Sequence, residues 1–398
     1  MHLLIVHNDY GIYSGEEAAV DRMIDNAQRC GHTVSLLRRT SVGRRDSLWG
    51  KVHGFLSGIY SLSGRREMRR MLRSHRPDVV VIHNLYPFIS PAVLPLCRRA
   101  GIPVVMTVHN YRLICPTGLF LRNGLPCEHC LQKGNEWGCV RYNCEHSRFR
   151  SLGYALRNRA ARRYRYYKDN ITAYCCLTDF QKEKLIAAGY DRERMYIVPN
   201  YIDFSRIPAV SAPGDCIAYV GRLSPEKGYD LLVEVARRHR DIRFCFAGDF
   251  RDGKKPSVPE NVELLGAVGA DQVERLYRQA RFVVIPSRCY EGFPSVLIEA
   301  AAHARCCIAP DHGAFPDLLS SESDGSRYGL LFHANDADDL ERQIVSLWND
   351  PKRCQEMGLK ARSNCEKRFS KTRVVAEWDG ILHAAVEQQH HTQTLHNV

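Results

Sequence analysis

Hydrophobic and polar positions alternate along the chain in a rhythm that predicts an α/β protein. Short apolar runs suit strands that are buried on both faces of a parallel sheet. Between them, apolar residues at helical spacing predict helices, beginning with residues 16–29. In the first half the predicted strands are Leu3–His7, Thr33–Leu37, Pro77–His83 and Pro103–Val108.

The second half repeats this alternation of strands and helices. Its predicted strands are Ile217–Val220, Arg243–Ala247, Val262–Leu264, Phe282–Pro286 and Cys306–Ala309. Its predicted helices are Asp230–Arg238, Asp271–Arg278, Ser295–His303 and Asp338–Asn349. We therefore expect two doubly wound domains, whose ligands bind beyond the carboxyl ends of the strands.

The break between the halves falls near Pro199–Asp203, before a stretch that contains Ser, Pro and Gly. We predict a first domain over residues 1–200 and a second over 201–371. Residues 389–398 are polar and rich in histidine, and we expect them to form a loose tail.

The composition fits an ordinary globular protein. The chain has 398 residues, of which 44% are hydrophobic and 25% are charged, which excludes a disordered chain, a collagen and a coiled-coil rod. No apolar run reaches the ~18 residues that a membrane-spanning helix needs. The start of the chain lacks the basic leader of a signal peptide, so we expect a cytoplasmic protein.

Positive charge is concentrated in the first half. Residues 1–200 hold 31 Lys and Arg against 16 Asp and Glu, whereas the rest of the chain is slightly acidic. This asymmetry predicts an anionic partner, such as a phosphate ligand, a membrane surface or nucleic acid.

A loop between a predicted strand and a predicted helix carries two cations. It reads Gly-Arg-Leu-Ser-Pro-Glu-Lys-Gly over residues 221–228. Glycine lets the backbone approach a ligand, and the following helix offers its positive end. Arg222 and Lys227 could therefore neutralise a diphosphate, or the loop could be a solvated basic turn.

A second segment carries two glutamates eight residues apart. Glu291 precedes a predicted helix and Glu299 lies within it. Eight helical residues span ~12 Å, so the two carboxylates suit an extended ligand better than a single atom. The free backbone N–H groups at the helix start could bind a phosphate.

Taken together, these segments resemble the donor-site motifs of the family-4 retaining glycosyltransferases, which have the GT-B fold of two Rossmann-like domains facing across a cleft. The resemblance extends over most of the chain. Further matching motifs are Gly15-Glu16-Glu17, Pro199-Asn200-Tyr201-Ile202-Asp203, Gly248-Asp249 and Gly329-Leu330-Leu331-Phe332. Tyr201 departs from the pattern, because the family usually has glycine there.

The resemblance assigns the first domain to the acceptor and the second to the nucleotide sugar, and it implies that helix 372–388 packs back on the first domain. Arg222 and Lys227, with Gly221, would hold the diphosphate, and Glu299 the ribose. The donor sugar would meet the remaining residues that the family pattern indicates, namely Glu291, Gly292, Phe293 and Pro294. His109 would face sugar and acceptor, and Gly15 would approach the phosphate.

The implied enzyme is a retaining hexosyltransferase that needs no metal or other cofactor for catalysis. Its donor would be a UDP- or GDP-linked sugar, and its acceptor a glycan, lipid-linked, in polysaccharide or glycoconjugate biosynthesis. Fixed cations would stabilise the negative charge that develops on the leaving diphosphate. Asp336-Ala337-Asp338 has a metal-binding form, but it precedes a predicted helix, so we interpret it as a cap.

A cysteine-rich insertion covers residues 112–148 and resembles a segment of the polysaccharide-type members of the family. Cys127, Cys130, Cys139 and Cys144 form two close pairs. Four thiolates in this arrangement suit a structural zinc ion, although free or redox-active thiols are the alternative.

Residues 148–168 are basic, and aromatic residues are interleaved with the arginines. A helix of this kind can lie on anionic lipid, which would place the protein peripherally at the inner face of the membrane. A solvated helix face is the alternative. The arginines between residues 65 and 73 could extend the same surface.

Two other functions stay open at this point. A nucleotide-sugar epimerase of the same fold would turn over its substrate without an acceptor. A zinc-stapled, basic nucleic-acid-binding protein would show salt-sensitive binding. The paired glutamates would repel a phosphate backbone, so we expect no nucleic acid among the partners.

Overall fold

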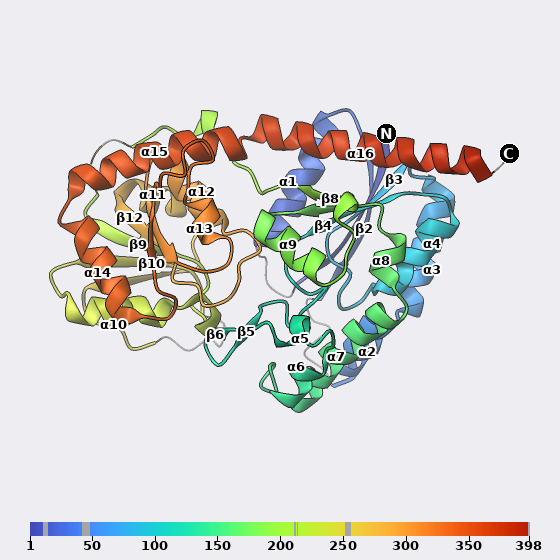
Figure 1. The fold of residues 1–398 in the computed structure, drawn as a ribbon, viewed down its shortest axis with the longest axis horizontal. Coiled ribbons are helices and arrows are strands. Elements are labelled where there is room, and N and C mark those ends of the chain that lie inside the picture. The colour runs from blue at the N-terminus through green and yellow to red at the C-terminus, as the bar shows by residue number, and fades with distance from the viewer. Residues whose placement is uncertain (11–14, 42–47, 211, 213, 251–255, 397–398) are drawn as a thin grey trace. The chain divides into compact units, whose positions relative to one another are not determined.

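The computed structural model describes residues 1–10, 15–41, 48–210, 212, 214–250 and 256–396. The chain forms two compact units. Unit 1 contains residues 1–118, 128–199 and 375–398, and unit 2 contains residues 119–127 and 200–374. Each unit is built around one six-stranded parallel sheet (Figure 1).

The sheet of unit 1 has the strand order β2-β1-β3-β4-β7-β8. The side chains of β3 are completely buried because helices cover both faces of a doubly wound sheet. The register aligns His2 with Thr33 and Leu3 with Val79. The strands are β1 (His2–Asp9), β2 (Thr33–Thr40), β3 (Val79–Ile82), β4 (Val104–Val108), β7 (Ala173–Cys176) and β8 (Met195–Ile197).

Helices alternate with these strands. Those of unit 1 are α1 (Gly15–Arg29), α2 (Leu48–Ile59), α3 (Leu62–His75), α4 (Leu94–Arg99), α5 (His129–Gln132), α6 (Trp137–Arg141), α7 (Arg148–Arg163), α8 (Tyr166–Asn170) and α9 (Asp179–Ala187). Ser61 caps α3 and Ser147 caps α7, each through its hydroxyl.

The sheet of unit 2 has the order β11-β10-β9-β12-β13-β14. Its strands are β9 (Cys216–Val220), β10 (Arg243–Ala247), β11 (Val262–Gly266), β12 (Ala280–Val284), β13 (Cys307–Pro310) and β14 (Leu330–Phe332). The core of this unit includes the buried rings of Phe244, Phe246 and Phe282. A separate two-stranded hairpin, β5 (Leu121–Arg122) and β6 (Leu125–Pro126), also belongs to unit 2.

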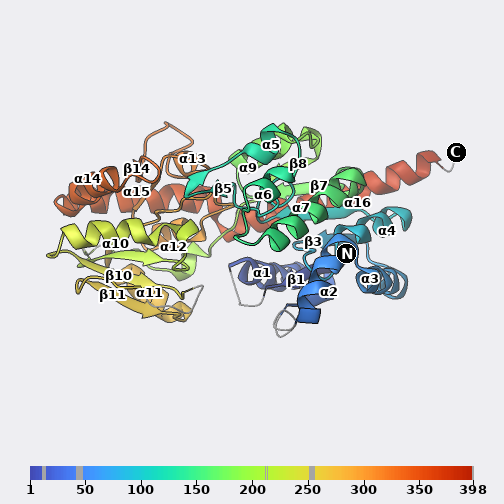
Figure 2. The ribbon, with the colours of Figure 1, turned by 90° about the horizontal axis from the view of Figure 1, so that it is seen from below.

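Helices surround the second sheet as well (Figure 2). They are α10 (Tyr229–Arg238), α11 (Ala270–Gln279), α12 (Ser295–Ala302), α13 (Phe315–Leu318), α14 (Ala337–Trp348) and α15 (Pro351–Phe369). The last helix, α16 (Lys371–His396), begins in unit 2 and belongs to unit 1 from Val375 onward. The side chain of Asp336 accepts two backbone N–H bonds at the start of α14, which confirms the predicted cap.

In each sheet the strand order reverses beside the first strand of that unit. The reversal lies between β1 and β3 in unit 1, and between β9 and β12 in unit 2. Ligands of doubly wound folds bind at such points, outside the carboxyl ends of the strands. A ligand site is therefore expected in the loops after β1 and β3 in unit 1, and in the loops after β9 and β12 in unit 2.

Two sequence-based expectations differ from the structure. The predicted tail over 389–398 is helical as far as His396, because α16 continues through the polar residues. The predicted insertion over 112–148 does not stay within the first unit, because residues 119–127 belong to unit 2.

Candidate active site

The loop after β9 is held by a close approach of two backbones. Gly248 has φ +150, and a Cβ on it would lie 1.8 Å from the carbonyl oxygen of Gly221, so only glycine fits. The hydroxyl of Tyr219 donates to the carbonyl oxygen of Arg222 at 2.6 Å. The predicted phosphate loop is therefore a tightly shaped turn.

Lys227 and Glu291 are joined directly in unit 2. The Nζ of Lys227 donates to both carboxylate oxygens of Glu291, at 2.7 and 2.9 Å. The hydroxyl of Ser287 donates to the same carboxylate. Gly228 makes this possible because a Cβ there, at φ +67, would lie 1.9 Å from the carbonyl oxygen of Pro286.

The pair is charged on both sides at neutral pH. Burial acts against the charge of Lys227, but the carboxylate of Glu291 outweighs it and raises the pKa of the lysine. Burial likewise opposes the charge of Glu291, yet Lys227 and the hydrogen bonds hold the pKa of this carboxyl below its usual range. The sequence placed Lys227 at the diphosphate and Glu291 at the sugar; the structure brings the two side chains into contact.

Arg222 provides a second cation in the same loop. Its side chain is 55% exposed, and its Nη2 lies 3.5 Å from a carboxylate oxygen of Glu226. The charge of Arg222 also helps to lower the pKa of Glu291. An anion that binds here would meet the exposed guanidinium of Arg222 and the ammonium group of Lys227, which the ion pair with Glu291 holds in place.

Helix α12 follows Gly292, Phe293 and Pro294 and begins at Ser295. The first backbone N–H groups of a helix lack helical acceptors and attract anions. The ring of Phe293 is buried and packs edge-on against Phe369 at 5.3 Å. The backbone of this segment is therefore what it could offer to a ligand, and the predicted donor contact stays a prediction.

Glu299 lies in α12 and is oriented by a tyrosine. The hydroxyl of Tyr277, from α11, donates to Oε2 of Glu299 at 2.8 Å. Burial and the neighbouring carboxylate raise the pKa of this tyrosine. Sequence reasoning missed Tyr277 and Ser287, because neither belongs to a recognisable motif; only the fold brings them to the glutamates.

In unit 1, three neighbouring strands have a histidine at or near their carboxyl ends. His7 lies in β1, His83 follows β3 and His109 follows β4. The Nδ1 of His83 lies 2.9 Å from Nε2 of His109, and the two rings are stacked at 5.1 Å. The sequence predicted His109; it gave no reason to single out the other two.

All three imidazoles are neutral at neutral pH. Burial lowers the pKa of His109 to about 4, against a smaller opposing effect of Glu17. Burial also lowers the pKa of His83 and that of His7, with His109 acting in the same direction on both. His109 is half-buried, so a substrate can meet a neutral hydrogen-bonding group there.

Gly15 starts α1, and a Cβ on it would have no atom within 4 Å, so its backbone is open to a ligand. The next residue, Glu16, is half-buried and accepts a hydrogen bond from the hydroxyl of Tyr10 at 2.9 Å. Arg112 donates to the same hydroxyl at 2.7 Å. Burial raises the pKa of Glu16, although Arg112 counteracts it.

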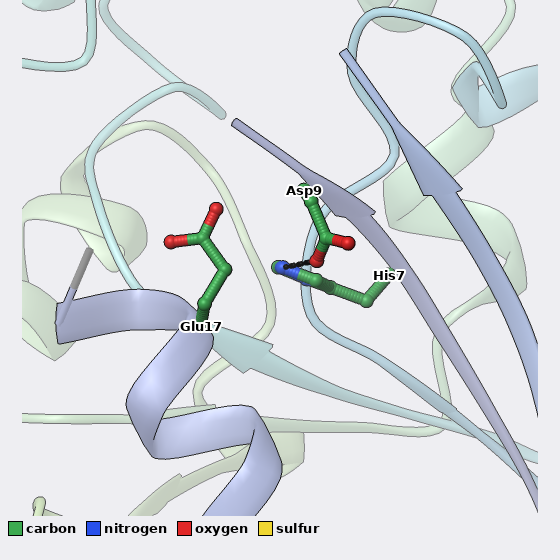
Figure 3. Close-up of side chains that lie close together, drawn as sticks. All are labelled: His7, Asp9 and Glu17. Atoms are coloured by element: carbon green, nitrogen blue, oxygen red, sulfur yellow. Dashed lines mark ion pairs between the residues drawn. The ribbon is translucent and has the colours of Figure 1, made fainter. Parts of the chain in front are cut away.

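His7, Asp9 and Glu17 point toward one another (Figure 3). Among the described residues, this is the one group of three or more His, Cys, Asp or Glu ligand atoms that all lie within 4.8 Å of one another. Arg38 donates its Nε to both oxygens of Asp9, at 2.9 and 3.0 Å, and Glu17 accepts the backbone N–H of Tyr10 at 2.6 Å. The positive charge of Arg38 therefore already balances the negative charge of Asp9.

The cysteines predicted to bind zinc divide between the units. Cys127 belongs to unit 2, and the other three to unit 1. A hydrogen bond with Cys144, together with burial, raises the pKa of Cys139, and Cys115 and Cys130 act in the same direction. Thiols suit zinc, but the three sulfurs of unit 1 do not all lie within 4.8 Å of one another. The zinc site stays a prediction.

Two family models match the chain. Residues 14–201 match the model "Glycosyl transferase 4-like domain", and residues 205–364 match "Glycosyl transferases group 1". Together they cover most of the sequence.

Curated relatives agree with these matches. The "Uncharacterized 42.6 kDa protein in cps region" of Klebsiella pneumoniae is 22% identical over 80% of this chain and 87% of its own length. An uncharacterized glycosyltransferase of Methanocaldococcus jannaschii is 33% identical over 38% of this chain and 43% of its own. The poly(ribitol-phosphate) alpha-N-acetylglucosaminyltransferase of Staphylococcus aureus is 23% identical over 54% of this chain and 45% of its own.

Solved structures share the fold. HepE of Anabaena, solved in complex with UDP and glucose, superposes with a TM-score of 0.67 at 14% identity, over 96% of this chain and 100% of its own. Sucrose-phosphate synthase of Thermosynechococcus elongatus superposes with a TM-score of 0.70 at 14% identity, over 96% and 98%. With two parallel six-stranded sheets and both family models matched, the chain belongs to the family-4-like glycosyltransferases of the GT-B fold.

Proposed function

We propose that this glycosyltransferase is a retaining hexosyltransferase. It moves a sugar from a nucleoside-diphosphate donor to a glycan acceptor, lipid-linked, in polysaccharide or glycoconjugate biosynthesis. The observation that carries the proposal is the Lys227–Glu291 ion pair at the strand-order reversal of unit 2, beside the exposed Arg222. These groups provide positive charge for a diphosphate and a carboxylate for sugar hydroxyls.

The reaction exchanges one bond for another at the anomeric carbon of the donor sugar. The bond to the diphosphate oxygen breaks, and the electron pair leaves with the diphosphate. Arg222 and Lys227 stabilise that charge, because fixed cations in a partly buried site need no reorganisation. The acceptor oxygen bonds to the anomeric carbon on the face that the diphosphate leaves, and its proton passes to a phosphate oxygen. His109, neutral, hydrogen-bonds sugar and acceptor hydroxyls. No metal takes part.

The donor is a UDP- or GDP-linked sugar. The HepE structures with UDP and with UDP-glucose favour testing uridine nucleotides first. The experiment is a thermal-stability screen with UDP, GDP, ADP and their sugar conjugates, on the wild type and on Glu299→Ala. A ligand at 100 times its Kd stabilises by about 2.7 kcal/mol. We expect one base to stabilise the wild type selectively and the variant less.

The transfer itself is tested with the donor identified in that screen. Proton NMR of the product reports the configuration of the new bond, which we expect to match the donor. An inverted configuration would contradict the retaining mechanism. Turnover of the nucleotide sugar without an acceptor would instead identify an epimerase.

The acceptor is a polymer or its lipid-linked precursor. Support comes from the Staphylococcus aureus relative, whose name describes transfer of N-acetylglucosamine to poly(ribitol-phosphate). Within the described residues, none of the helices is long and apolar enough to cross a bilayer. As part of the same proposal, a lipid-linked acceptor would be met at the membrane surface, on the cytoplasmic side.

A surface of unit 1 suits contact with anionic lipid. Helices α2 and α7 lie side by side, with Phe55 stacked on Phe149 at 4.9 Å (Figure 1). Exposed apolar side chains on and beside α2, α3 and α7 are Leu56, Tyr60, Leu62, Phe149, Leu152 and Tyr164. Exposed arginines on α3 and α7 are Arg66, Arg69, Arg70, Arg73, Arg148, Arg150, Arg159, Arg162 and Arg163. Arg157, which the sequence pattern included, is instead buried and donates to the carbonyl of Pro116.

Vesicle sedimentation tests this surface. Each basic residue near an anionic membrane contributes about 1 kcal/mol, so reversing Arg66 and Arg69 to glutamate should weaken binding to phosphatidylglycerol-containing vesicles by at least about tenfold. The matched control reverses Lys352 and Lys360, which are exposed on α15. Equal binding by both double variants, or equal binding to pure phosphatidylcholine, would contradict an anionic-lipid surface.

A further inference from the structure

The hairpin of residues 119–127 is a well-defined local structure. Leu121 pairs with Pro126 and Arg122 with Leu125, which leaves a two-residue turn of Asn123 and Gly124. Their φ values of +52 and +76 are those of a type I′ turn, for which Asn-Gly is the preferred sequence. The hairpin is thus encoded locally and can act as a small rigid arm.

The base of this hairpin is fixed by Phe120. Its carbonyl accepts the backbone N–H of Cys127 at 2.6 Å. Phe120 has φ +48, which is uncommon for an aromatic residue, yet its side chain is only 1% exposed. The ring is therefore buried by packing that outweighs an unfavourable backbone conformation.

That packing is against the loop that carries Glu291. The ring of Phe120 lies 5.7 Å from the ring of Tyr290, which lies 5.5 Å from the ring of His312. His312 in turn is 3.1 Å from the carbonyl oxygen of Ser287. The segment from Ser287 to Tyr290, which precedes Glu291, thus takes part in a row of three rings, the first of which comes from the hairpin.

The turn of the hairpin reaches a second residue of the same loop. A Cβ on Gly124 would lie in van der Waals contact with Cδ of Arg288, at 3.8 Å. Arg288 bonds both carboxylate oxygens of Asp230, at 2.6 and 2.7 Å, and donates to the carbonyl oxygen of Pro225 at 3.0 Å. Its backbone N–H donates to the carbonyl oxygen of Glu226. Arg288 therefore connects the segment that carries Lys227 to the segment that carries Glu291.

We propose that the hairpin of residues 119–127 is a wall of the donor-sugar site, and that Phe120 is a positioning residue that holds Glu291 in place through Tyr290. This inference rests on the proposed function, because it assumes that Glu291 binds the sugar of the donor. The hairpin approaches Tyr290 and Arg288, and both residues lie in the loop that carries Glu291. It therefore governs recognition of the sugar and leaves recognition of the nucleotide unchanged.

The test compares donor KM with inhibition by the free nucleotide. With UDP-glucose as donor and UDP as inhibitor, Phe120→Ala should raise the donor KM about tenfold, whereas the inhibition constant of UDP and kcat should stay near wild type. If the screen above selects GDP, the same pair of guanosine nucleotides is used. Phe120→Leu, which keeps apolar bulk, should have an intermediate effect. Leu359→Ala, at a 47% exposed position on α15 of the same unit and outside the proposed site, is the matched control.

Tyr290 supplies the second variant, in case Phe120→Ala does not fold. Tyr290→Leu should reproduce the rise in donor KM, and Tyr290→Phe, which keeps the ring, should not. Unchanged donor KM in both ring-removing variants, with transfer abolished by Lys227→Met, would overturn the inference and leave the proposed function standing. Absence of transfer in the wild type, or full activity of Lys227→Met, would overturn the proposed function and the inference with it.

Discussion

The two units have the same kind of doubly wound sheet, but the side chains beyond the carboxyl ends of their strands are charged in unit 2 and neutral in unit 1. In unit 2, the loops beyond β9 and β12 hold a paired lysine and glutamate that are both charged. In unit 1, the ends of β1, β3 and β4 hold three histidines that burial keeps neutral. A doubly wound sheet thus offers a place for chemistry, but the residues after its strands decide its kind. Unit 2 is suited to a group that gains charge, and unit 1 to hydroxyls.

The largest effect should come from removing the cation of unit 2. In the proposed mechanism Lys227 stabilises the leaving diphosphate, so Lys227→Met should lower kcat by about 10²–10³-fold. Steady-state kinetics provide the measurement. The control is Lys184→Met, which should leave kcat near wild type. It removes an ion pair of unit 1, in which Nζ of Lys184 lies 2.6 Å from Oε1 of Glu128. Similar losses of kcat in both variants would mean that the Lys227–Glu291 pair only stabilises the folded protein and takes no part in catalysis.

Removing the neutral group of unit 1 should have a smaller effect. His109→Ala should lower kcat by about 10²-fold, the lower end for a lost proton-handling or hydrogen-bonding group. Because the pKa of His109 is lowered to about 4, it should not impose a loss of activity at its ordinary pKa of 6.5. The pH profile of kcat measures this. A titration near 6.5 that disappears in His109→Asn would contradict the neutral site.

Nucleotide binding should depend on Glu299 more than on the tyrosine that orients it. A hydrogen bond to a charged group contributes about 1.5–3 kcal/mol, so Glu299→Ala should weaken UDP binding by about 10- to 100-fold. Tyr277→Phe removes only the 2.8 Å hydrogen bond to Glu299 and should weaken it less. Calorimetric titration gives both affinities. The reverse order would assign the ribose contact to Tyr277.

The smallest effect concerns stability against pH. The pKa of His109 lies near 4 in the folded protein and at its ordinary 6.5 in the unfolded chain, so the unfolded state binds more protons between these values. The stability that this histidine contributes is complete above pH 6.5 and is lost as the pH falls toward 4. His109→Asn should therefore reduce the fall in Tm over this range. His383→Asn, at a position with a 54% exposed side chain, is the control and should leave the fall unchanged.

The alternating sheets were predictable because their strands are continuous apolar runs. The predicted strand at residues 243–247 coincides with β10, and most of the other predictions differ from the observed strands by a few residues at the ends. Strands β7, β8 and β14 were missed, because β7 contains two cysteines and a tyrosine and the other two have only three residues each. Runs this short or mixed give no clear period.

The candidate site was predictable in its residues but not in its pairings. Motifs and spacing placed Arg222, Lys227 and Glu291 in two loops and Glu299 in the helix after the second loop, and both loops follow strands as expected. The Lys227–Glu291 contact depends on how closely β9 and β12 bring their loops together, which involves Gly228 and Pro286. Neighbours such as Tyr277 and His83 come from other strands and helices, so their part in the site depends on tertiary packing.

The hairpin of residues 119–127 has a consequence for the inheritance of donor preference. It is encoded in the first half of the chain, yet it belongs to the unit that the second half builds. A chimera that joins two relatives at Pro199 would pair each second unit with a foreign hairpin. A chimera that receives only the second half of a relative should then not acquire that relative's donor preference. It should acquire this preference when residues 119–127 are exchanged together with the second half. Recombination between relatives would face the same constraint, because the exchangeable part is discontinuous in the gene.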